Sequence, residues 1–207
     1  MIDYRGMLVA KLYFRYGAMN SGKSTMLLQT AFNYEERGHR VLLAKPEIDT
    51  KGASQIASRL GMSREVDLLL AADAHPREQF AAATANGNVS CLLVDEAQFL
   101  SAAQVDELFQ IAVLDEVPVL CYGIRTDFQT AAFPGSRRLL EIAHSIEELK
   151  TICRCGRKAI FNGRRVGGEF VFDGAQVAID GEAVTTYESM CGRCYLEESS
   201  GRLASHL

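Results

Sequence analysis

The chain has 207 residues, a formal net charge of −4 and 48% hydrophobic residues. This length is sufficient for one α/β domain of ordinary size and a small second domain, and the apolar content predicts a packed core. The acidic balance argues against strong non-specific binding to nucleic acid. No apolar run is long enough to span a membrane and no secretory leader is expected, so the cytoplasm is the predicted location.

A complete phosphate-loop pattern, G-x-x-x-x-G-K-[ST], lies between an apolar strand predicted at 8–14 and a helix predicted to begin at Thr25. In this setting, backbone N–H groups of the loop and of the helix N-terminus point at bound phosphates. Lys23 is expected to reach the β- and γ-phosphates, and Ser24 to offer its hydroxyl to Mg²⁺. The alternative is a plain turn before a helix. The pattern comprises Gly17, Ala18, Met19, Asn20, Ser21, Gly22, Lys23 and Ser24.

Strands and helices are predicted to alternate through about residue 150. Apolar runs predict further strands at 40–45, 66–70, 89–94 and 117–122, and helical spacing predicts helices at 75–85, from 101 and at 137–143. Residues 47–64 are polar and contain glycine, so we expect a loop or an irregular excursion. Ser101 is expected to cap its helix. Continuous apolar strands separated by helices predict an α/β fold with a parallel sheet covered on both faces.

The second chemical feature is the sequence Asp95-Glu96-Ala97-Gln98-Phe99, directly after the strand at 89–94. An acidic residue at the carboxyl end of a strand neighbouring the phosphate loop holds Mg²⁺ or orients its waters, which is the predicted role of Asp95. Glu96 is expected to point elsewhere and to act as a general base toward a hydroxyl or water. Gln98 is expected to orient a substrate or water, and Phe99 either stacks on a base or belongs to the core. The alternative for the acidic pair is a helix cap on the surface.

The six cysteines divide into two groups. Cys91 and Cys121 lie inside apolar runs and are expected to be buried core thiols. The other four form a C-x-C and a C-x-x-C pair, which suit tetrahedral, structural Zn²⁺. The alternative is a redox dithiol of the thioredoxin type. Neither pair is expected to begin a helix after a strand, so zinc is favoured. The four predicted ligands are Cys153, Cys155, Cys191 and Cys194.

The character of the chain changes after Leu149. Residues 151–195 contain the cysteine pairs, many glycines and short alternating segments, and show no helical periodicity. So few residues bury little core alone, which predicts a small β-rich domain closed by metal. We therefore predict a P-loop ATP-binding domain at 1–149, a zinc-binding domain at 150–196 and a flexible tail at 197–207.

Five blocks of the sequence together resemble the cytosolic thymidine kinases of the bacterial and cellular type. They occur in family order across residues 8–196, and they are 17–24, 95–99, 121–128, 149–159 and 187–194. The resemblance implies a P-loop (RecA-like) fold, ATP and Mg²⁺ as cofactors, and structural Zn²⁺. It also implies 5′-phosphorylation of thymidine or deoxyuridine by a homotetramer.

The resemblance also implies roles for single residues. Glu96 matches the catalytic base, and Arg59 matches an arginine near the transferred phosphate, where it can stabilise transition-state charge; the alternative for Arg59 is an exposed loop charge. The positions that match the nucleotide site beyond the loop are Asp95, Glu96, Ala97 and Gln98. The positions that match the surroundings of the thymine ring, each of which can equally be core packing, are Met19, Phe99, Ile124, Phe128 and Tyr187. The four cysteines match the zinc ligands.

Segment 177–187 is the candidate flap over the nucleoside, since a kinase that transfers to a small alcohol must exclude water. This segment is about two residues longer than is usual in the family, and Asp180-Gly181 stands where a Gly-Gly pair is usual. Two alternatives from other classes are a P-loop ATPase that acts on nucleic acid and a nucleotide-binding regulator without catalysis. The acidic balance and the lack of a clustered basic face argue against the first.

Overall fold

A computed structural model describes residues 10–47, 54–85, 87–176 and 184–204 of the chain. Its centre is a six-stranded parallel sheet of order β5-β2-β6-β7-β1-β8. The strands are β1 (Leu12–Tyr16), β2 (Val41–Pro46), β5 (Leu68–Leu70), β6 (Cys91–Val94), β7 (Val119–Gly123) and β8 (Ser145–Glu148). The predicted parallel α/β fold is therefore confirmed.

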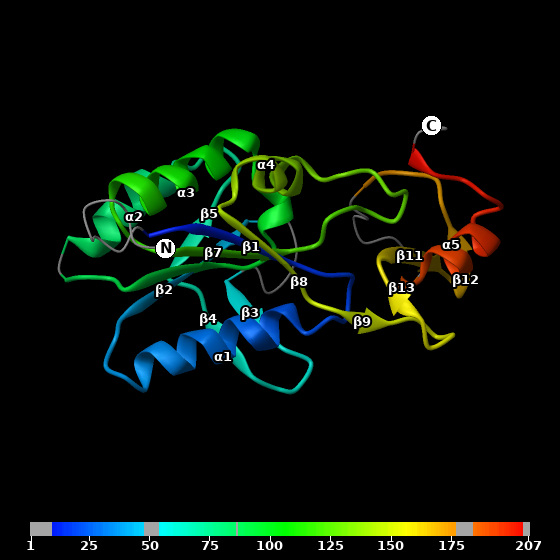
Figure 1. Cartoon of the computed structure of the whole chain (residues 1–207), viewed down its shortest axis with the longest axis horizontal. Helices are drawn as coiled ribbons and strands as arrows, with labels where there is room; N and C mark the ends of the chain where they lie inside the picture. Colours follow the sequence, from blue (N-terminus) through cyan, green and yellow to red (C-terminus); the bar gives the residue numbers. More distant parts are fainter. Residues whose placement is uncertain (1–9, 48–53, 86, 177–183, 205–207) are drawn as a thin grey trace.

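Helices cover both faces of this sheet, as Figure 1 shows. On one side lie α2 (Pro76–Thr84), α3 (Ala102–Leu114) and α4 (Pro134–Ile142), and on the other lies α1 (Lys23–Glu35). Two buried clusters separate along the strands because successive side chains alternate between faces. Leu42 and Ala44 pack on the α3 side, whereas Leu43 and Leu93 pack on the α1 side. Cys91 and Cys121 are buried core thiols, as predicted.

Three parts of this domain differ from the sequence prediction. The segment 47–64, predicted as a loop, contains β3 (Gln55–Ala57), which pairs with β4 (Ser63–Glu65) in a short antiparallel hairpin. Only Ile56 of this hairpin is buried, so no apolar alternation marks it in the sequence. Strand β8 was not predicted because it is a mostly exposed, polar edge strand. Helix α4 begins three residues before the predicted Arg137, at Pro134, a residue that favours the first helical position.

A smaller β-rich region follows the parallel sheet and lies beside its carboxyl edge (Figure 1). It contains the antiparallel pair β9 (Thr151–Ile152) and β10 (Lys158–Ala159), and a three-stranded sheet of order β12-β11-β13. The latter strands are β11 (Phe161–Val166), β12 (Glu169–Val171) and β13 (Thr185–Met190). The predicted small β region is confirmed.

A helix also lies in this region, where the sequence shows no helical periodicity. Helix α5 (Gly192–Glu198) has seven residues, too few to reveal a period of 3.6, and begins directly after β13. It crosses the predicted boundary at 196, and Ser199 after it is buried; the division into three domains stays a prediction. In the described part of the chain, every helix is too short or too polar to cross a lipid bilayer.

Candidate active site

The phosphate loop joins the carboxyl end of β1 to the first residue of α1, as the motif requires. A Cβ atom on Gly17 would lie 2.5 Å from the carbonyl oxygen of Leu149, so only glycine fits there. Gly22 has a φ of 80°, in the left-handed region that glycine adopts without strain. Lys23 donates from Nζ to the carbonyls of Gly17 and Ala18 at 3.3 and 3.1 Å, and its burial lowers its pKa.

Asp95 lies at the end of β6 and reaches the loop. Its Oδ2 accepts a hydrogen bond from Ser24 Oγ at 3.1 Å. Strand β7 lies between β6 and β1 in the sheet, and the side chains of Asp95 and Ser24 meet across it, so Asp95 lies beside the phosphate loop as predicted. The Oδ1 atom of Asp95 is buried and has no hydrogen-bond partner among the described residues. A carboxylate oxygen left open beside a hydroxyl is a ligand set that fits Mg²⁺.

The pKa of the Asp95 carboxyl group is shifted by its surroundings. Burial, with the negative charge of Glu96 as a second cause, raises the pKa of Asp95 from 3.8 to about 6. A buried carboxylate without enough partners is costly in its ionised form. A cation beside Asp95 would offset this cost.

Glu96 follows in the left-handed conformation, with a φ of 49°, which is unusual for a residue with a side chain. Its carboxylate accepts a hydrogen bond from Gln98 Nε2 at 2.5 Å. Gln98 is itself buried, and its Oε1 accepts from the backbone N–H of Ile124 at 3.2 Å. The N–H of Ile124 thus fixes which end of the Gln98 amide faces Glu96.

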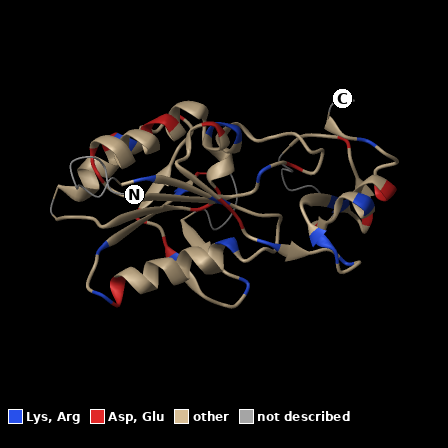
Figure 2. Cartoon of the chain, viewed as in Figure 1, with Lys and Arg blue, Asp and Glu red and all other residues tan. Residues whose placement is uncertain are grey.

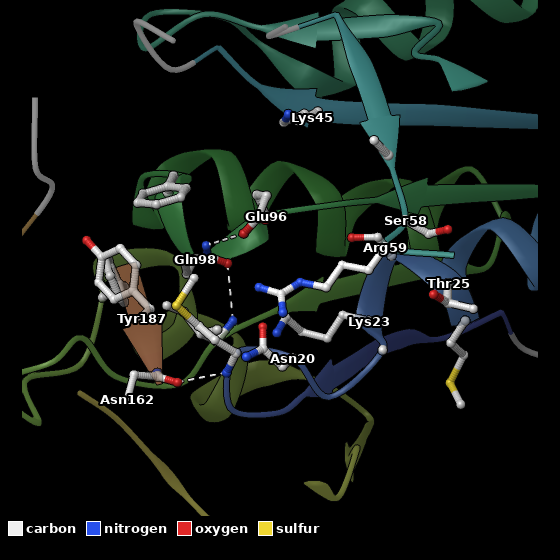
Figure 3. Close-up of a pocket in the computed structure, with 18 of the residues that line it drawn as sticks. Asn20, Lys23, Thr25, Lys45, Ser58, Arg59, Glu96, Gln98, Asn162 and Tyr187 are labelled. Atoms are coloured by element: carbon white, nitrogen blue, oxygen red, sulfur yellow. Dashed lines mark hydrogen bonds between the residues drawn. The ribbon is translucent and has the colours of Figure 1, made fainter. Parts of the chain in front are cut away.

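One cavity of about 890 Å³ adjoins the loop, and it brings the predicted residues together. In Figure 3, Lys23 and Arg59 extend side by side into the cavity, with Glu96 across from them. The predicted base-pocket residues all line the same cavity, namely Met19, Phe99, Ile124, Phe128 and Tyr187. Gly17, Ala18, Ser21, Asp95 and Ala97 are not among its lining residues. The donor loop and the apolar wall therefore share one space.

Several lining residues were missed by sequence reasoning. They include Lys45 of β2, Ser58 beside Arg59, Asp127, Phe133, Asn162 of β11 and Gln176. Asp127 and Gln176 bind each other at 3.0 Å between Oδ2 and Nε2. Asp127 lies in the 121–128 block, which was a signal for it; the others carry no motif. Of the candidate flap, residues 177–183 lie outside the described residues.

The four predicted zinc ligands form a cluster in the small β region. The Sγ atoms of Cys153, Cys155, Cys191 and Cys194 all lie within 4.8 Å of one another. This arrangement is compatible with a tetrahedral thiolate site, in which Zn–S distances are about 2.3 Å. The Sγ atoms of Cys155 and Cys191 lie 3.5 Å apart.

One premise of the zinc prediction is wrong. Cys191 directly follows β13 and caps α5, so the C-x-x-C pair does begin a helix after a strand. The convergence of a second cysteine pair on the same point is what favours a metal over a redox dithiol, because a dithiol needs only two sulfurs.

These features define a P-loop nucleotide-binding protein with a small cysteine-rich β region. Residues 10–195 match the family model described as thymidine kinase. The thymidine kinase of Chromobacterium violaceum is 47% identical over 189 residues, covering 90% of this chain and 98% of that protein. The thymidine kinase of Shewanella oneidensis is 46% identical over 191 residues, covering 91% and 98%, and that of Haemophilus influenzae strain Rd is 44% identical over 197 residues, covering 94% and 100%. The chain belongs to the thymidine kinase family.

Proposed function

We propose that this chain transfers the γ-phosphate of ATP to the 5′-hydroxyl of thymidine or deoxyuridine. Membership of the thymidine kinase family makes it a kinase, and hence a transferase. The observation that carries the assignment is the shared cavity, in which the phosphate loop and an acidic side chain face an apolar wall. A phosphoryl donor and a nucleoside acceptor need such a common space.

On the donor side, the loop and Lys23 are proposed to hold the phosphates of ATP. Ser24 and Asp95 are proposed to hold Mg²⁺, which neutralises charge on the β- and γ-phosphates when bound. The open Oδ1 of Asp95 and its hydrogen bond from Ser24 support this ligand pair.

On the acceptor side, the 5′-oxygen attacks the γ-phosphorus while the bond to the bridging oxygen of ADP breaks. Glu96 is proposed to accept the 5′-hydroxyl proton on its carboxylate. The hydrogen bond from Gln98 supports a fixed orientation of that carboxylate. Arg59 is proposed to stabilise negative charge on the transferred group, which its position beside Lys23 in the cavity supports.

The base is proposed to lie against the apolar lining residues Met19, Phe99, Ile124, Phe128 and Tyr187. Phe99 packs edge-on against Phe133 with ring centroids 5.3 Å apart, which supports a rigid wall. Closure by segment 177–187 is proposed to exclude water, which would otherwise take the γ-phosphate.

Other parts of the assignment are also proposals. Zn²⁺ is proposed to be held by Cys153, Cys155, Cys191 and Cys194 and to close the small domain without entering the reaction. A homotetramer and a cytoplasmic location are proposed on the family resemblance and on the acidic, cysteine-bearing composition. Sedimentation analysis at micromolar protein tests the tetramer.

The rival function, a P-loop ATPase acting on nucleic acid, is not favoured by the family match. In Figure 2 the described Lys and Arg residues are spread over several elements among Asp and Glu, which does not support a nucleic-acid face.

A product assay with ATP, Mg²⁺ and a panel of nucleosides tests the proposal. We expect thymidine and deoxyuridine monophosphates to form, and Glu96→Gln to reduce the rate by at least about a hundredfold. ATP turnover that rises with single-stranded DNA and not with thymidine would contradict the kinase assignment. ATP binding without any nucleoside phosphorylation would favour a non-catalytic regulator.

A further inference from the structure

Two side chains of the small β region bind the backbone of the phosphate loop at one residue. Asn162 Oδ1 accepts a hydrogen bond from the N–H of Met19 at 2.7 Å, and the hydroxyl of Ser189 donates to the carbonyl of Met19. Figure 3 shows the first of these bonds between Asn162 and the loop. Both polar groups of the Met19 backbone are therefore satisfied from a different part of the chain.

The pairing of β11 with β13 explains why these two side chains act together. Asn162 and Ser189 are direct partners in the antiparallel register, and directly opposite residues project from the same face of a sheet. A single cross-strand pair thus presents one acceptor and one donor to a single peptide residue of the loop.

Both side chains are buried, with 3% and 6% of their surface exposed, so water competes little for their bonds. Asn162 is also oriented from behind, because its Nδ2 donates to the carbonyl of Thr126 at 3.2 Å. That bond leaves Oδ1 facing the N–H of Met19. The contact is consequently built into the fold and is not a chance surface contact.

The loop changes backbone conformation at this point. Asn20, the next residue, has a φ of 66°, a left-handed conformation that asparagine adopts more readily than most residues with a side chain. Its carbonyl accepts only a long bond, 3.5 Å, from Thr151 of β9. The two hydrogen bonds to Met19 therefore hold the loop directly before this change of conformation.

We propose that Asn162 and Ser189 are positioning residues for the phosphate loop, so that the small β region helps to build the ATP site. This inference deepens the proposed function, in which that region carries the nucleoside flap. Without the hydrogen bonds from Asn162 and Ser189, the loop samples other conformations and the population able to bind phosphates falls. The apparent affinity for nucleotide is then lower.

Ser189→Ala is the cleanest test, because Ser189 is not among the residues that line the cavity. We expect the dissociation constant for Mg²⁺·ADP, measured by titration calorimetry, to rise about five- to tenfold, the effect of losing one intramolecular hydrogen bond. Hydrogen exchange in the 17–24 peptide is expected to become faster, while exchange in the β7 peptide stays the same. The KM for ATP is expected to rise with the dissociation constant.

Thr186→Ala is the matched control, since it removes a hydroxyl at an exposed position of the same strand. It is expected to leave ADP affinity within about twofold of the wild type. Ser189→Thr, which keeps the hydroxyl, is expected to restore most of the affinity. Asn162→Ala is a second variant with the same expected change in loop exchange, and it serves if Ser189→Ala does not fold.

Unchanged ADP affinity and unchanged exchange of the loop in both alanine variants would overturn the inference. A lower unfolding temperature with normal ADP affinity would do the same, because it would assign Ser189 a purely structural role. These readouts are independent of nucleoside phosphorylation. A wild-type protein that binds ADP but does not phosphorylate thymidine would therefore refute the proposed function and leave the loop contact testable.

Discussion

Replacing Gln98 by methionine isolates the support of Glu96. Methionine is unbranched and of similar length, so the cavity wall is kept while the amide is lost. The substitution removes the 2.5 Å bond to the Glu96 carboxylate and leaves the N–H of Ile124 without its 3.2 Å acceptor. Glu96 then holds its left-handed backbone without the side-chain contact that orients its carboxylate.

The expected loss follows from the kind of bond that is removed. A hydrogen bond to a charged group contributes about 1.5 to 3 kcal/mol, and each 1.4 kcal/mol corresponds to about tenfold in rate. We therefore expect the kcat for thymidine phosphorylation to fall about ten- to a hundredfold. The KM for ATP should change little, because the hydrogen bonds of the Gln98 side chain to described residues go to Glu96 and Ile124 and not to the phosphate loop.

Gln104→Met is a matched control for the loss of a buried amide. Gln104 completes the capping box of α3 with Ser101 and donates to the carbonyls of Ala71 and Ala74. Its replacement should lower the free energy of unfolding by about 1 to 3 kcal/mol and leave kcat within about twofold. Steady-state kinetics and thermal unfolding of both variants provide the comparison. A Gln98→Met enzyme with wild-type kcat would refute the positioning of Glu96 by Gln98.

Three further predictions concern the charge of Asp95, the cysteine cluster and the buried side chain of Arg164. Because the pKa of Asp95 is raised to about 6, ionisation of Asp95 destabilises the folded state, and the free energy of unfolding falls as pH rises from about 4 through 6. Asp95→Asn should therefore raise the free energy of unfolding of the nucleotide-free protein by about 3 kcal/mol at pH 7.5 and by less than about 1 kcal/mol at pH 4. An equal gain at both pH values in urea titrations would contradict this. Cys155→Ser should reduce bound zinc, measured by mass spectrometry of metals, well below one equivalent; unchanged zinc would count against the four-cysteine site. Arg164 is buried, lies 3.6 Å from the ring centroid of Phe128 and donates to the carbonyls of Asp173 and Ala175, so Arg164→Met should lower the free energy of unfolding by about 2 to 4 kcal/mol and raise the KM for thymidine. Arg165 also lies over a ring, that of Phe170, and donates to the carbonyl of Gly168, but it is half-exposed, so Arg165→Met should cost less than Arg164→Met. Equal losses in thermal unfolding of the two variants would show that burial of the guanidinium is unimportant.

The parts of the site that the sequence predicts are those carried by consecutive residues. The phosphate loop, the Asp95-Glu96 pair and the cysteine pairs each occupy a short segment whose spacing fixes the local geometry. Buried strands are equally visible because their apolar runs are continuous, as in Cys91–Val94. The polar strand Ser145–Glu148 has no such run, and its place in the sheet comes only from pairing with β1.

Contacts between distant segments could not be predicted in the same way. Met19 meets Asn162 and Ser189 across 143 and 170 residues of chain, and no periodicity links them. Strand order is a property of the whole sheet, so no residue near Asp95 signals that β7 lies between β6 and β1. The short helix after Cys191 likewise depends on the cap that Cys191 supplies.

The geometry of β13 explains why one small region can serve both substrates. Tyr187 and Ser189 lie two residues apart on this strand and so project from the same face, one lining the cavity and the other bonded to the loop at Met19. Cys191 follows directly, at the cysteine cluster. A rigid shift of this strand would move the base wall and the loop anchor together. Five consecutive residues therefore hold the proposed base wall, the anchor of the phosphate loop and the cysteine cluster, which fixes the spacing between the proposed acceptor and donor sites.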